Sequence, residues 1–176
     1  AGMETFVHEV GDESYPPLNR PVGLLAWLRE GAGRELPPSA VVLIVDSDMV
    51  FTGPGLREAL VPLAQRALEV PSGALGSDYF YTVKGLAFHN WTLADRFNVS
   101  NVSRLQSIAV PIMLRKDALE RIAAPYYSIT RDIAGDPKLH ALVHDGQQPA
   151  PWIAEMVGYT LAAAGLPHET QQQWPA

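Results

Sequence analysis

Unbroken apolar stretches and helically spaced apolar residues alternate along the chain. Residues 41–45 are five consecutive aliphatic residues, which predicts a strand buried on both faces, as in a parallel α/β sheet. Residues 108–114 form a second apolar stretch, in which Pro111 predicts an edge strand or a bulge. Residues 79–83 have the aromatic and β-branched composition of a third strand. Together these stretches predict the sheet of an α/β domain.

Apolar residues at three- and four-residue spacing predict helices around these strands. The first helix is expected to begin near Pro21, with Asn19 as its N-cap, and to stop at Gly31. Pro62 is expected to kink or interrupt the second helix, and Pro125 to end the third. The later helices are expected over residues 56–70, 116–123, 126–142 and 152–164.

Two aspartates, Asp46 and Asp48, follow the first predicted strand directly. Ligands of open α/β sheets bind at the carboxyl ends of the strands. Two carboxylates one residue apart repel each other, so both stay ionised most easily with a cation between them. Oxygen ligands suit Mn²⁺ or Mg²⁺. The sequence therefore predicts a metal site at Asp46 and Asp48, and an exposed turn carrying two aspartates is the alternative.

A single carboxylate, Glu155, lies in the apolar and aromatic pattern of the last helix. Trp152, Met156 and Tyr159 share its face at helical spacing. A charge on such a face needs a partner or a wet pocket. Glu155 is therefore either a carboxylate that lines a sugar pocket between aromatic rings, or a glutamate at the rim that pairs locally.

Composition narrows the classes of function. The chain has 176 residues, of which 47% are hydrophobic, so it can form one sizeable core. Its net charge of -6 and lack of a basic run argue against nucleic acid as a main partner. No stretch approaches the roughly 20 apolar residues of a membrane span, so a membrane anchor is expected only outside this chain. His140 and His144 lack the glutamate of a zinc-protease motif, which favours a pair of surface histidines.

Three N-glycosylation sequons begin at Asn90, Asn98 and Asn101. Each is a chance match unless the chain passes through a secretory lumen. Asn98 and Asn101 are too close for both to be filled together.

Motifs over residues 15–175 resemble the hydroxyproline O-arabinosyltransferase family and the related peptidyl-serine α-galactosyltransferases. The Asp-x-Asp motif is weak, because many nucleotide-sugar enzymes share it, and the last motif below is the most specific. The motifs are Tyr15-Pro16, Asn19-Arg20-Pro21, Trp27-Leu28, the apolar strand with its aspartates, Tyr79-Phe80-Tyr81, Pro111, residues 116–123, Asp136-Pro137 and Trp152-Ile153-Ala154-Glu155-Met156-Val157-Gly158-Tyr159.

The resemblance implies that residues 1–176 are a single, partial GT-A-type (Rossmann-like) domain with a mixed sheet. Its first nucleotide-binding strand and its C-terminal end, with the distal His that commonly completes the metal site, are expected to be missing. The implied activity is a retaining transfer of arabinofuranose or galactose from a UDP-sugar to hydroxyproline or serine of secreted glycoproteins, in the Golgi or ER lumen. Asp46 and Asp48 would bind Mn²⁺ (or Mg²⁺), Asn19 and Arg20 would reach the nucleotide or its phosphates, and Glu155 would be catalytic at the reacting sugar.

Departures from the family pattern leave alternatives open. The family has Asp-Pro-Ile-Gly-Asn-Ser-Pro where this chain has residues 105–111, so a carboxylate and an amide are missing, and Met49 replaces a usual His. These departures favour a non-catalytic carbohydrate-binding or scaffold protein on a glycosyltransferase fold. A haloacid-dehalogenase-like phosphohydrolase, with Asp46 as nucleophile and Asp48 as acid/base, fits less well because its other motifs are badly placed here.

Overall fold

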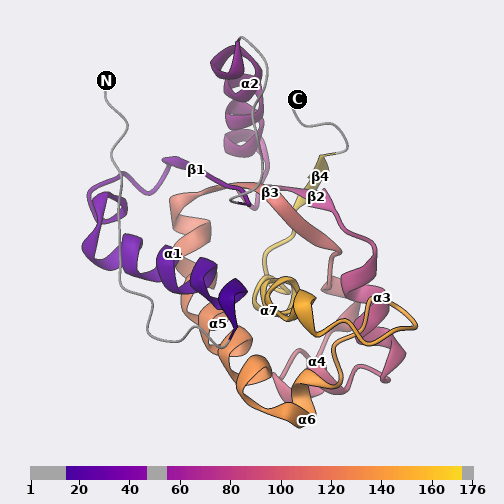
Figure 1. The fold of residues 1–176 in the computed structure, drawn as a ribbon. Helices are drawn as coiled ribbons and strands as arrows, with labels where there is room; N and C mark the ends of the chain where they lie inside the picture. The colour runs from indigo at the N-terminus through magenta and orange to yellow at the C-terminus, as the bar shows by residue number, and fades with distance from the viewer. Residues whose placement is uncertain (1–14, 47–54, 172–176) are drawn as a thin grey trace.

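The computed structural model describes residues 15–46 and 55–171. In this part of the chain, four strands form one mixed sheet in the order β1-β3-β2-β4 (Figure 1). Strand β3 is antiparallel to both β1 and β2, whereas β4 is parallel to β2. The α/β class and the mixed sheet with flanking helices are confirmed. The strands are β1 (Val41–Ile44), β2 (Ala74–Asp78), β3 (Ile108–Arg115) and β4 (Glu169–Gln171).

Helices cover both faces of this sheet. Helix α5 packs against α1 and α7 on one face, and α2 packs on β3 from the other (Figure 1). None of the described helices is both long and apolar enough to cross a membrane. The α-helices are α1 (Asn19–Glu30), α2 (Leu56–Glu69), α3 (Tyr81–Phe88), α4 (Thr92–Arg96), α5 (Lys116–Gly135), α6 (Pro137–His140) and α7 (Ala154–Ala162).

Strand β3 carries side chains into both cores because successive strand residues point to opposite faces. Ile112 and Leu114 join the core formed with α1, α5 and α7. Met113 joins Leu75 and the apolar residues of α2 on the other face. The cores on the two faces of the sheet therefore share strand β3.

Strand β1 differs from its prediction in pairing and burial. It pairs antiparallel with β3, because the chain returns through α3 and α4 and enters β3 in the opposite direction. No other described strand pairs with β1, so Val41, Val42 and Leu43 are only half-buried and Ile44 alone is buried. The expected parallel strand buried on both faces is wrong.

The second strand lies earlier than its prediction. Residues 79–83 were expected to form a strand, but β2 ends at Asp78 and α3 begins at Tyr81. Gly76, a residue type that is disfavoured in strands, lies inside β2. A Cβ there would lie 2.5 Å from the Ile108 side chain, so glycine permits the close contact between the strands.

Three prolines test the expected breaks. Pro111 lies in the central strand, where the register shifts between Gly76 and Ser77. The expected bulge is therefore confirmed and the expected edge position is wrong. Pro62 lies inside α2 and Pro125 lies inside α5. The predicted helix end at Pro125 is therefore also wrong. A proline costs a helix about 3 kcal/mol, and the long buried face of α5 offsets that cost.

Candidate functional site

Arg20 joins two carboxylates from distant parts of the chain. Its Nη2 is ion-paired with Oδ1 of Asp46, which follows the end of β1. Its Nη1 donates to Oε2 of Glu155 on α7 at 2.7 Å. A guanidinium carries several N–H donors in a fixed fork and can serve both partners at once. The structure thus brings together three of the residues that the sequence singled out.

The first turn of α1 sets the position of Arg20. Pro16 to Leu18 form a 3-10 turn that leads directly into α1. Asn19 is the first residue of the helix, and no side chain caps it, so the N-cap role predicted for Asn19 is wrong. The preceding turn replaces a cap because the Asn19 N–H already bonds within it. The partial positive charge of a helix N-terminus adds to that of Arg20.

Glu155 is held in the protein interior by two groups. Its side chain is paired with Arg20, and the residue is 3% exposed. The Tyr15 hydroxyl accepts a hydrogen bond from the Glu155 N–H and donates one to the Trp152 carbonyl, both at 3.1 Å. Burial raises the pKa of Glu155 to about 7, although Arg20 opposes the rise. Burial also raises the pKa of Tyr15 to about 12, so that hydroxyl keeps its proton.

A pocket of about 580 Å³ opens beside the ion pairs at the carboxyl end of β1. It lies between the turn that precedes α1 and the end of β1. Glu155 is not among its described lining residues and lies behind Arg20. The pocket is lined by Pro16, Pro17, Asn19, Arg20, Val45 and Asp46.

The aromatic residues around Glu155 do not flank it as the helical spacing suggested. Trp152 precedes α7, in a 3-10 turn, and is 57% exposed. Tyr159 is buried and its hydroxyl lies 2.6 Å from Nε2 of His168. Tyr159 is therefore not free to stack on a sugar, and the local partner of Glu155 is Arg20.

A buried hydrogen-bonded chain at His168 was not found from the sequence. Burial lowers the pKa of His168 to about 4, so the ring is neutral. Nδ1 donates to the Leu166 carbonyl at 2.8 Å, and Nε2 accepts from Tyr159. The Gln106 side chain also bonds both backbone groups of His168, at 2.6 and 3.0 Å. No spacing in the sequence signals these contacts, because they join three separate segments.

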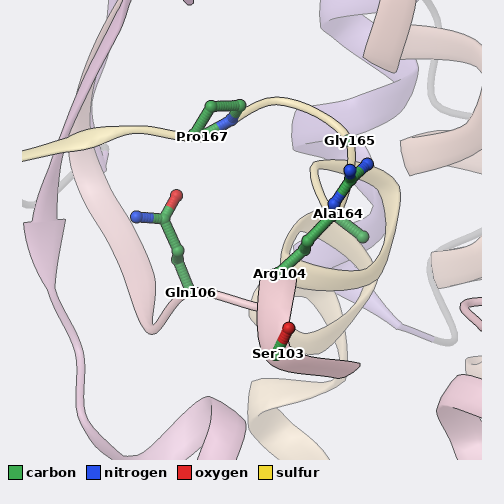
Figure 2. A pocket seen from close by; sticks show the side chains of 6 residues that line it. All are labelled: Ser103, Arg104, Gln106, Ala164, Gly165 and Pro167. Carbon is green, nitrogen blue, oxygen red and sulfur yellow. The ribbon is translucent and has the colours of Figure 1, made fainter. Parts of the chain in front are cut away.

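Gln106 also lines a second pocket, of about 480 Å³ (Figure 2). Figure 2 shows Arg104 extending toward Ala164 and Gly165, and Gln106 extending toward the segment that carries Pro167. The described lining contains no carboxylate, and both polar ends of the Gln106 amide bond the backbone of His168. This pocket therefore lacks the paired charges of the first one. Its lining residues are Ser103, Arg104, Gln106, Ala164, Gly165 and Pro167.

The described part of the chain contains one of the two aspartates predicted to bind a metal. Asp48 lies outside the described residues, and within them no three His, Asp or Glu side chains are grouped to hold a metal ion. Asp46 meets Arg20 through Oδ1, which leaves Oδ2 as the oxygen for a cation. Carboxylate oxygens fit Mn²⁺ or Mg²⁺, so Asp46 is suitable as one ligand of such a site.

The profile described as "Hydroxyproline O-arabinosyltransferase family N-terminal domain" matches residues 3–172. The chain belongs to this family. No solved structure matches this member of the hydroxyproline O-arabinosyltransferase family.

Three curated relatives are similar over most of the chain. It is 27% identical to the peptidyl serine alpha-galactosyltransferase of Chlamydomonas reinhardtii, over 97% of this chain and 22% of that protein. It is 27% identical to the Arabidopsis thaliana protein of the same name, over 92% of the chain and 19% of the relative. It is 24% identical to hydroxyproline O-arabinosyltransferase 3 of Arabidopsis thaliana, over 87% of the chain and 37% of the relative. The family domain thus spans well under half the length of these relatives.

Two of the departures from the family pattern lie in the core of this family member, and Met49 lies outside the described residues. Leu105 and Ala109 stand where the pattern has a carboxylate and an amide, and both are buried, at 7% and 5% exposure. Leu105 packs in the core formed by α7 and its neighbours. These positions therefore contribute packing in this chain.

Proposed function

We propose that this chain is part of a retaining, metal-dependent glycosyltransferase with a partial GT-A-type domain. It transfers arabinofuranose or galactose from a UDP-sugar to hydroxyproline or serine of secreted glycoproteins. The relatives named for such transfers support the proposal. The observation that carries it is Arg20, held between Asp46 and Glu155 at the wall of a 580 Å³ pocket.

Arg20 is suited to the diphosphate of the donor. In the transfer, the bond between the anomeric carbon and the diphosphate oxygen breaks, and negative charge grows on UDP. The acceptor oxygen bonds to the same face of the anomeric carbon and its hydroxyl proton is released. A guanidinium fixed beside the pocket stabilises the developing charge without rearranging first. Asn19 at the same helix start is proposed to contact the nucleotide.

Asp46 and Asp48 are proposed to hold Mn²⁺ or Mg²⁺, which supplies Lewis-acid stabilisation of the diphosphate. Glu155 is proposed to be a positioning residue, because it lies behind Arg20 and fixes the guanidinium toward the pocket. Direct action of Glu155 on the reacting sugar stays a prediction. The non-catalytic scaffold remains the second candidate, and the core positions of Leu105 and Ala109 favour it.

The metal proposal predicts a ligand-dependent thermal shift. Mn²⁺ with UDP should stabilise the protein by about 2.7 kcal/mol at a hundredfold excess over the dissociation constant, because a ligand of the native state stabilises that state. Differential scanning fluorimetry measures the shift. Asp48→Asn should abolish it, whereas Asp95→Asn, an exposed aspartate on α4, should retain it. An unchanged shift in Asp48→Asn excludes the metal site, and no UDP binding by any form favours the scaffold.

The secretory proposal predicts a glycan in the sequon segment. Asn90, Asn98 and Asn101 are all exposed. The Asn101 Oδ1 accepts hydrogen bonds from the Ser103 N–H at 3.2 Å and from the Ser103 hydroxyl. A glycan attaches to Nδ2, so glycosylation of Asn101 preserves both bonds. After secretion from a eukaryotic host, we expect a glycan on Asn101 or Asn98 but not both, or on Asn90.

Peptide mass spectrometry identifies the occupied residue. Ser103→Ala should remove any glycan from Asn101 and leave the Asn90 sequon untouched. Secreted protein with all three asparagines bare would contradict this prediction.

A further inference from the structure

Three aromatic side chains cluster where β2 passes into α3, and we call Tyr79, Phe80 and Tyr81 the aromatic triad. The Tyr81 ring meets Tyr79 and Phe80 edge-on, with centroid distances of 5.6 and 5.9 Å. Phe80 is 60% exposed and Tyr81 47% exposed. Grouped large rings that stay in water mark a surface for binding rather than for folding.

The sheet places this triad beside the candidate site. Strands β1 and β2 both run antiparallel to β3, so their carboxyl ends lie at the same edge of the sheet. Ile44 and Gly76 flank the same residue, Ile112. Asp46 and Asp78 each follow two residues later, but the register shift after Gly76 sets Asp78 opposite Ile108. Their separation therefore exceeds two strand spacings, about 10 Å. The triad begins immediately after Asp78, so it lies at the same end of the sheet as the Arg20–Asp46 pocket.

The chemistry of the triad suits a polyproline II segment. Such a segment has no internal hydrogen bonds, so its carbonyls are open to donors such as tyrosine hydroxyls. Its pyrrolidine rings fit between aromatic side chains, the recurring mode by which proteins bind proline-rich peptides. Lys84 lies 5.1 Å from the Phe80 ring centroid, which holds that ring at the surface through a cation–π contact. The segment advances about 3.1 Å per residue, so a span of more than about 10 Å takes at least four residues.

We propose that the aromatic triad docks the acceptor polypeptide in the polyproline II conformation, holding residues at least four positions away from the hydroxyl that receives the sugar. This inference rests on the proposed function, since it names the surface on which that acceptor binds. The triad determines which polypeptides are accepted, and the Arg20–Asp46 pocket binds the donor.

Direct peptide binding tests the proposal without any donor. The probe is a fluorescently labelled decamer of hydroxyproline with a central serine, titrated by anisotropy against the protein. Phe80→Ala and Tyr81→Ala should each weaken peptide binding about tenfold. Phe80→Trp keeps an aromatic ring at this position and should bind the peptide as the wild type does. The matched control is Leu68→Ala, an apolar residue that is 45% exposed on α2 across the sheet, and it should bind as the wild type does. A trimer should bind far more weakly than the decamer.

The outcomes separate this inference from the proposed function. Unchanged decamer binding in both alanine variants overturns the docking surface, as does equal binding of a glycine-serine decamer. UDP affinity, measured in the same proteins, should be unaffected by the triad variants. If the wild type does not bind UDP but binds the peptide through the triad, the proposed transferase is refuted and the docking surface is retained.

Discussion

Replacing Arg20 with methionine should lower the free energy of unfolding by about 3 kcal/mol at pH 8. The change removes the ion-pair partner of Glu155, and Glu155 is only 3% exposed. The carboxylate must then stay charged without its ion-pair partner or take up a proton, and either alternative is costly. Urea denaturation followed by circular dichroism measures the loss.

A matched control and a rescue make this prediction specific. Arg29→Met alters an exposed arginine in the last turn of the same helix, and it should change stability by less than about 0.5 kcal/mol. Combining Arg20→Met with Glu155→Gln should recover part of the loss, because the buried carboxylate is then gone and only the more exposed Asp46 is left without its partner. A loss below about 1 kcal/mol in Arg20→Met would show that the ion pair does not hold the two elements together.

Raising the pH from 4 to 8 should destabilise the wild type relative to Glu155→Gln by about 3 kcal/mol. The pKa of Glu155 is about 7 in the folded protein and ordinarily 4.5, so the folded state binds the proton more tightly than the unfolded state. The stability that this group contributes is therefore fully present below pH 4.5 and is lost as the pH rises through 7. Each unit of pKa difference is worth about 1.4 kcal/mol, which gives the expected magnitude.

The measurement is the difference in unfolding free energy between wild type and Glu155→Gln at five pH values. Glu30→Gln, at the exposed end of α1, serves as the matched control for the loss of one carboxyl group. A difference that changes in the opposite direction would mean that Arg20 outweighs burial and that the pKa of Glu155 lies below its ordinary value. A flat difference would mean that Glu155 does not titrate with folding.

Sequence reasoning could locate Asp46, the part of the site that directly follows β1. The aliphatic run before Asp46 is a local signal, and the structure has a strand there that leads directly to the pocket. The contact between Arg20 and Glu155 was not accessible, because 135 residues separate them and no periodicity links the two segments. The sequence left two roles open for Glu155, lining a pocket or pairing locally. Arg20 is its partner because α1 and α7 both pack against α5.

The fold errors have a related cause. Gly76 signals a loop in isolation, but here it makes room for Ile108 within the sheet. Pro125 signals a helix end, but α5 continues through it because its buried face packs against two other helices. In both cases local propensity was outweighed by packing against residues distant in sequence. Residues with strong local preferences were therefore misread where tertiary contacts were densest.

The strand order has a consequence for biosynthesis. Strands β1 and β2 do not pair with each other, and both depend on β3. The sheet edge that carries Asp46 and the aromatic triad therefore cannot assemble until the ribosome has made Arg115. From Asp78 to Arg115 that interval is about 2–7 s at a synthesis rate of about 5–20 residues per second. During this interval β1 and β2 have no β3 to pair with, and the apolar residues of β1 stay uncovered. This stretch of the nascent polypeptide is therefore a target for chaperones.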